Sequence, residues 1–118
     1  MNFDEAIAAH SAWKIKLGAY LRHPDGSLQA ASVASDDRCT LGQWLHGEGS
    51  KFRSLAEYRT LQTAHSKFHE CAADVVRKAD AGQSVTDEVA FGARSEFGLA
   101  SSAVVNSIGA LRKKVHAA

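Results

Sequence analysis

Apolar side chains recur every three to four residues along three long stretches of the chain, and this spacing is what most constrains its fold. The stretches run from Asn2 to about Leu21, from about Lys51 to Ala81, and from Ser84 to the C-terminus. Such spacing places the apolar residues on one face of an α-helix. The chain has one proline, Pro24, and no run of alternating β-branched residues that would predict a strand. We therefore expect an all-α fold.

Turn and capping residues between the long stretches predict one further, short helix. A His-Pro-Asp-Gly turn ends the first helix, and residues 27–35 are compatible with either a loop or a loose helical turn. Asp36 and Asp37 are suited to cap a short helix over residues 38–45, which the glycines at 47 and 49 then end. The pattern predicts an antiparallel four-helix bundle of three long helices plus one short helix that carries Cys39.

The size and charge of the chain narrow the classes of protein it can be. Its 118 residues fit one domain, residues 1–118, and 45% of them are hydrophobic, as in ordinary globular proteins. Fourteen basic against thirteen acidic residues give a net charge of +1, without the basic patch that nucleic-acid binding requires. No apolar run is long enough to cross a bilayer, and no signal peptide is recognisable. We expect a cytoplasmic protein that neither binds nucleic acid nor inserts into a membrane.

Three histidines lie where a buried metal site could form. His65 and His69 are four residues apart, so their imidazoles project from the same helix face. Taken alone, such a pair most often consists of two histidines that are hydrogen-bonded within the protein or exposed to solvent. However, His65 lies on the apolar face of its helix, and His10 lies on the apolar face of the first helix. Buried imidazoles need a hydrogen-bond or metal partner. Three inward imidazoles and one thiolate would complete a tetrahedral zinc site.

Of the two cysteines, Cys39 is the better candidate for the fourth ligand. Cys71 lies two residues after His69, about 200° around the helix, and is expected to fill the core. Cys39 lies in the first turn of the short helix, where free amide hydrogens and the helix dipole favour a thiolate with a lowered pKa. Gly42 would let this helix approach its neighbours closely, and Trp44 would exclude water from the site. Both residues could equally serve packing alone.

Three motifs in the first 70 or so residues resemble those of the chemoreceptor zinc-binding domains of bacteria. They are, in chain order, His10-Ser-Ala-Trp13, Cys39-Thr-Leu41-Gly42-Gln-Trp44 and His65-Ser-Lys-Phe-His69. The resemblance implies a four-helix bundle that binds Zn²⁺ through His10, Cys39, His65 and His69. It implies that Trp13, Leu41, Gly42 and Trp44 support this site and that Cys39 is the redox-reactive group.

The same resemblance implies a sensory or regulatory module without catalytic turnover. Relatives control a chemoreceptor signalling region or a diguanylate cyclase, and dimerisation occurs among them. The expected signal is the zinc level, an oxidant such as hypochlorous acid, or both. Oxidation of Cys39 to a sulfenic acid, or loss of zinc, would free the short segment that carries this residue.

Two other functions remain open on the sequence. One is a small zinc hydrolase with an open three-histidine site and a bound water. The run from His65 to His69 lacks the glutamate that metalloproteases place after the first histidine, which argues against it. A di-iron bundle is less suitable still, because inward Glu-x-x-His motifs are absent. The second alternative is a purely structural bundle.

Overall fold

The computed structural model describes residues 2–83, 90–92 and 94–117, and the fold of these residues is entirely helical. This confirms the expected all-α class. The helical elements are α1 (Phe3–Arg22), α2 (Ala30–Ala34), α3 (Thr40–His46), the 3₁₀ helix η1 (Glu48–Phe52), α4 (Ala56–Asp80) and α6 (Glu96–Ala117). Within the described residues, no helix combines the length and apolarity needed to cross a bilayer.

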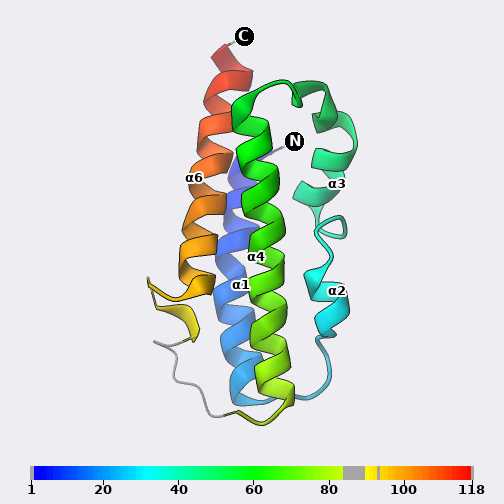
Figure 1. Ribbon diagram of the computed structural model, residues 1–118, viewed down its shortest axis with the longest axis vertical. Helices are drawn as coiled ribbons and strands as arrows, with labels where there is room; N and C mark the ends of the chain where they lie inside the picture. The colour runs from blue at the N-terminus through cyan, green and yellow to red at the C-terminus, as the bar shows by residue number, and fades with distance from the viewer. Residues whose placement is uncertain (1, 84–89, 93, 118) are drawn as a thin grey trace.

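Three long helices lie side by side, and the short helices form a separate arm along one of them (Figure 1). α1 and α4 run in the same direction, and α6 runs in the opposite direction (Figure 1). α2 and α3 follow one another along α4, and α2 packs directly against it. The prediction of one short helix is therefore wrong in its detail. Two short helices and η1 make up the connection between α1 and α4.

The ends of α1 follow from local chemistry. The Asn2 side chain accepts a hydrogen bond from the Glu5 amide at 3.0 Å, which caps the first turn. The helix ends at Arg22, and the turn that follows contains Gly26 with a φ of +79°. Glycine adopts this left-handed conformation without the steric cost that a side chain would add.

The long helix predicted from Lys51 begins later than expected. Residues 48–52 form η1, and α4 starts only at Ala56. A Cβ atom on Gly49 would lie 2.7 Å from the Trp44 ring, and the Phe52 ring lies 6.1 Å from that of Trp44. The Trp44 indole therefore rests on this segment, and its close contact with Gly49 accounts for a separate, tighter turn before α4.

The last helix also starts later than the sequence pattern indicated. Its predicted opening at Ser84 and Asp87 lies outside the described residues, but α6 itself begins at Glu96. The Ser95 hydroxyl donates to the Gly92 carbonyl at 2.7 Å and accepts from the Gly98 amide at 2.9 Å. Ser95 thus acts as the N-terminal cap, and the chain before it turns away from the helix axis.

One apolar core runs between the helices and holds the polar cluster described below. α4 contributes most to it, and both α1 and α6 pack against α4 and against each other. The largest fully buried apolar side chains come from α1, α3, α4 and α6; they are Phe68, Leu17, Leu41, Leu45, Leu61, Ile108, Leu111, Val76 and Val104.

Candidate metal centre

Two helices bring three imidazoles into the core. His65 and His69 project from α4 with their ring centroids 4.5 Å apart, and His10 projects from α1 with its ring 5.1 Å from that of His65. The exposed fraction is 2% for His10, 1% for His65 and 3% for His69, and values this low are rare for polar residues. Such burial requires that each imidazole has partners for its ring nitrogens.

The fourth member of the cluster is Cys39, at the N-terminus of α3. It is the N-cap residue of this helix, with extended backbone, and its Sγ accepts a hydrogen bond from the Gly42 amide at 3.3 Å. The prediction that Asp36 and Asp37 cap the short helix is therefore wrong, because the sulfur itself takes the cap position. This arrangement turns the Cys39 side chain inward toward α4.

Gly42 permits this inward turn because the chain before Cys39 folds back over α3. A Cβ atom at position 42 would lie 1.7 Å from the Asp36 carbonyl oxygen and 3.1 Å from the Asp37 Cα. These are backbone atoms, so no side-chain rotation could relieve the overlap. The close approach expected of Gly42 is present, and it positions the turn that carries Cys39.

The ligand atoms converge at separations typical of a tetrahedral zinc site. One potential ligand atom from each of His10, Cys39, His65 and His69 lies within 4.8 Å of the others. The Cys39 Sγ lies 3.2 Å from His65 Nε2 and 3.6 Å from His69 Nε2, and these two nitrogens are 3.0 Å apart. Zinc bond lengths of about 2.0–2.1 Å to nitrogen and 2.3 Å to sulfur imply roughly 3.3 Å between nitrogens and roughly 3.6 Å between nitrogen and sulfur. The cluster is therefore close to the dimensions that zinc requires.

Backbone carbonyls determine which nitrogen is free to bind in two of the three imidazoles, those of His10 and His69. His10 Nδ1 lies 2.8 Å from the Ala6 carbonyl oxygen, and His69 Nδ1 lies 2.9 Å from the Val33 carbonyl oxygen. A carbonyl only accepts, so each Nδ1 donates and each neutral ring keeps a lone pair on Nε2. Carbonyl acceptors of this kind orient histidines that bind metals.

The environment of His10 Nε2 is the observation that most directly indicates a bound cation. It is buried, and no donor among the described residues reaches it. A buried nitrogen without a partner is costly, and its lone pair lies beside two further Nε2 atoms and a sulfur. A bound Zn²⁺ would satisfy all four atoms together, so the residues present fit this ion.

The pKa values of the imidazoles favour the neutral form that a metal ligand needs. Burial lowers the pKa of His65 to about 3, with further lowering from His69 and His10. Burial also lowers the pKa of His10 and of His69, although the hydrogen bonds to the Ala6 and Val33 carbonyls partly oppose it. At neutral pH all three rings are therefore uncharged and available as donors of a lone pair.

The pKa of Cys39 departs from the sequence-based expectation. Burial raises it, while the amide hydrogens of Gly42, Leu41 and Cys39 act in the opposite direction. The predicted effect of the helix N-terminus is present, but desolvation of the thiolate outweighs it. In the metal-free protein Cys39 is consequently a thiol at neutral pH. A metal ion bound to Cys39 would supply the positive charge that favours loss of its proton.

The four residues expected to support the site differ in what they contact. The Trp13 ring lies 6.2 Å from that of His69, and Leu41 is 1% exposed within the core. Trp44 instead contacts Phe3 with ring centroids 5.5 Å apart, in addition to its contact with η1. These contacts favour the packing alternative for Trp44. It is Trp13 that lies against a metal-site histidine.

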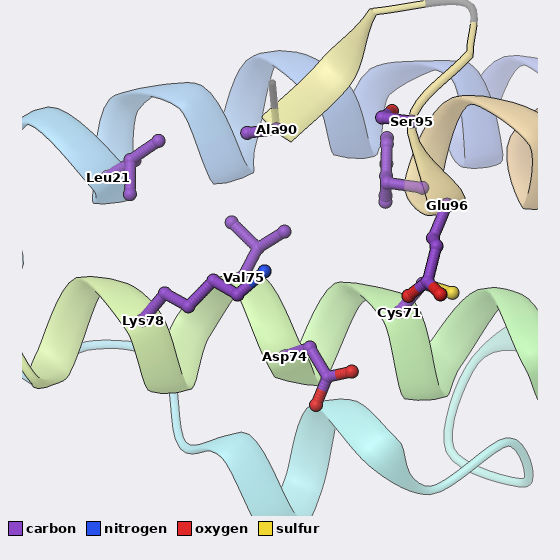
Figure 2. A pocket seen from close by; sticks show the side chains of 9 residues that line it. Leu21, Cys71, Asp74, Val75, Lys78, Ala90, Ser95 and Glu96 are labelled. Carbon is purple, nitrogen blue, oxygen red and sulfur yellow. The ribbon is translucent and has the colours of Figure 1, made fainter. Parts of the chain in front are cut away.

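Cys71 belongs to a different part of the molecule, as the sequence predicted. It lines a cavity of about 150 Å³ between α4, the end of α1 and the segment before α6, together with Asp74, Lys78 and Glu96 (Figure 2). Its thiol is buried, and burial raises its pKa.

Two contributors to the candidate metal centre were not predicted from the sequence. Val33 of α2 orients His69 through its backbone carbonyl, which no side-chain pattern can reveal. The charge of Asp36 adds to the effect of burial in raising the pKa of Cys39 and opposes the effect of burial in lowering that of His69, and its carboxylate lies 3.3 Å from His46 Nε2. Only the closeness of Asp36 to Cys39 in the sequence could have indicated this role, and we had assigned Asp36 to helix capping instead.

These features define the chain as a helical protein with a buried cluster of three histidines and one cysteine that suits zinc. Residues 10–76 match the family model of the chemoreceptor zinc-binding domain, and the chain belongs to this family. The resemblance found in the sequence motifs is thereby confirmed. Comparisons with curated proteins and with solved structures gave no match.

Proposed function

We propose that residues 1–118 form one zinc-binding sensory domain in which His10, Cys39, His65 and His69 hold a single zinc ion. The observation that carries this proposal is the convergence of Cys39 Sγ with His65 Nε2 and His69 Nε2 at 3.0–3.6 Å, beside the unpartnered Nε2 of His10. Bound zinc would keep Cys39 deprotonated at neutral pH and would tie α3 to α1 and α4. Membership in a zinc-binding family supports the choice of metal.

The position of Cys39 favours a sensory over a hydrolytic role. Catalytic zinc sites use three protein ligands and keep one position open for water, whereas structural and regulatory sites are closed by four. The Cys39 sulfur occupies the place where such a water would bind, 3.2 Å from His65 Nε2. This argues against the open three-histidine hydrolase and for a module without catalytic turnover.

Cys39 is also the group through which the site would respond to an oxidant. It is the only partly exposed member of the four, since the three histidines are buried. Its thiolate sulfur would take up the oxygen of hypochlorous acid to give a sulfenic acid, while chlorine leaves as chloride. Sulfur is oxidised in this step and chlorine is reduced. The sulfenic acid is uncharged, so it would bind Zn²⁺ more weakly than the thiolate does.

The output would be a change in the arm that carries Cys39. We propose that α2 and α3 together take the place of the fourth helix of an antiparallel bundle, and that loss of the Cys39 link loosens them from α4. A chemoreceptor signalling module or a diguanylate cyclase in the cytoplasm, attached or separate, would receive this change. A homodimer would present two such arms to the partner.

Cobalt substitution tests the ligand set. Cobalt bound by a thiolate gives a ligand-to-metal charge-transfer absorption that histidine alone does not produce. We expect this band in the wild-type protein and in Cys71→Ser, and its loss in Cys39→Ser. A band that survives in Cys39→Ser would remove Cys39 from the site and favour the hydrolase. A wild-type protein without stoichiometric metal would leave only a structural bundle.

Mass spectrometry after brief exposure to hypochlorous acid tests the response. We expect oxidation of Cys39 well before that of Cys71 in the zinc-loaded protein, because Cys39 is partly exposed and would be held there as a thiolate, whereas Cys71 is buried and remains a thiol. Equal oxidation rates at the two cysteines would contradict a sensing role for Cys39.

A further inference from the structure

A cavity of about 360 Å³ opens onto the candidate metal centre from the side of the arm. Cys39 and His69 form part of its wall. Most of the remaining wall comes from Trp13 of α1, from the chain between α1 and α3, and from Arg38. A molecule in this cavity can therefore reach the Cys39 sulfur without separating the long helices.

The wall of the cavity is selective in its chemistry. Trp13, Leu28 and Val33 give it a mainly apolar surface, and the other neutral lining residues are three serines and a glutamine. No aspartate or glutamate lines it, and Arg38 is the one side chain in its wall with a permanent charge. Arg38 is exposed and forms no ion pair with any other residue that the structure describes. Its charge is thus available to a molecule entering the cavity.

We propose that this cavity is a binding site for small thiol-reactive molecules that are uncharged or anionic, and that Arg38 determines this specificity. The proposal deepens the proposed function, since it assumes that Cys39 is the responsive group. An arginine without a protein partner attracts anions and repels cations, while apolar walls admit uncharged molecules. An oxidant that exists as a neutral acid and its anion near neutral pH fits both properties.

Three methanethiosulfonate reagents, one uncharged, one anionic and one cationic, test the specificity, and each rate is expressed relative to the rate of the same reagent with free N-acetylcysteine. The Cys39 thiolate attacks the sulfenyl sulfur of each reagent, a disulfide forms, and methanesulfinate leaves with the electron pair. One reagent carries a methyl group, one an ethylsulfonate and one an ethyltrimethylammonium. Because the same thiolate reacts in every case, ratios of the rates within one variant do not depend on its ionised fraction.

In metal-free Cys71→Ser protein at low salt, we expect the anionic reagent to modify Cys39 about threefold or more faster than the cationic one. Arg38→Gln should remove this preference, Arg38→Glu should reverse it, and Arg38→Lys should keep it. Lys113→Gln, which removes an exposed charge on α6, is the matched control and should leave the ratio unchanged. The rates with N-acetylcysteine give the intrinsic reactivity order of the three reagents in the absence of any protein charge.

Equal rates for the anionic and cationic reagents in the parent protein would overturn the proposal. An unchanged preference for the anionic reagent in folded Arg38→Gln would show that Arg38 does not determine the specificity. Neither result depends on metal binding, so the proposed zinc site can fail in the cobalt experiment while the cavity retains its preference. The reverse outcome would leave the zinc site standing and the cavity without a selective role.

Discussion

Replacement of Gly42 by alanine is the sharpest test of how the fold positions Cys39. The added Cβ would lie 1.7 Å from the Asp36 carbonyl oxygen and 2.7 Å from the carbonyl carbon. Ordinary contact begins near 3.4 Å, so the turn at Asp36 and the first turn of α3 must separate by about 1.7 Å. The atoms involved belong to the backbone, and the movement therefore reaches Cys39, three residues away.

A displacement of this size is large against the tolerance of a metal site. Ligand distances must lie within about 0.2 Å of their usual values. Even if Cys39 follows only a quarter of the movement, its sulfur leaves this range. We expect Gly42→Ala to weaken zinc binding by about 10–100-fold, as mutations that misplace ligands do. Overpacking at this position should also lower the free energy of unfolding by about 1–3 kcal/mol.

Competition with a chromophoric chelator measures the zinc affinity, and urea unfolding of the metal-free protein measures the stability. Gly109→Ala is the matched control, because a Cβ there has no atom within 4 Å and lies within α6. We expect that control to bind zinc normally and to be stabilised by up to about 1 kcal/mol through helix propensity. Wild-type zinc affinity in Gly42→Ala would refute the geometric reasoning.

Three further outcomes follow from the structure. Zinc at 100 times its dissociation constant should stabilise the protein by about 2.7 kcal/mol; a melting temperature that does not change on chelation, measured by calorimetry, would contradict a folded-state site. The free energy of unfolding of the metal-free protein should decrease as the pH falls below 6.5. His65 is protonated near this pH in the unfolded chain, whereas in the folded protein its pKa is lowered to about 3. This linkage amounts to at most about 1.4 kcal/mol per pH unit for one such group, and urea midpoints that stay constant between pH 7 and pH 5 would argue against it. Leu61→Ala, at a fully buried position of α4, should lower the free energy of unfolding by about 2–5 kcal/mol; a loss below 1 kcal/mol by urea unfolding would indicate a loosely packed core.

The helices and the candidate ligands were predictable because both depend on short-range sequence patterns. The i, i+4 spacing of His65 and His69 determines a shared face whatever surrounds α4. The position of His10 among apolar residues of α1 indicated burial in the same way. Cys39, 26 positions before His65, was linked to these residues by its place in the first turn of the short helix and then by the family motif.

The boundaries of the short elements depend on contacts between segments and could not be read in this way. η1 forms where Gly49 meets the Trp44 ring, a contact that no periodicity encodes. Asp36 and Asp37 have the side chains that most often cap helices, yet Cys39 takes that place because its sulfur must face α4. Its pKa was misjudged for the same reason: the helix N-terminus is a local feature, and desolvation comes from the surrounding fold.

The lengths of α2 and α3 explain why a change at Cys39 would be felt in the arm before it is felt elsewhere. Helices shorter than about 12–15 residues are marginal in water, and α2 and α3 have five and seven residues. Their order must come from tertiary contacts, which include the packing of α2 and its buried Val33 on α4, the buried Leu41 and Leu45, the contact of Trp44 with Phe3, the Val33 carbonyl on His69 and the Cys39 sulfur. The last two of these contacts are made directly to the candidate metal centre. α1, α4 and α6 have 20, 25 and 22 residues and pack against one another independently of Cys39. Loss of the Cys39 link therefore removes a contact that holds the arm and leaves the packing among the three long helices in place.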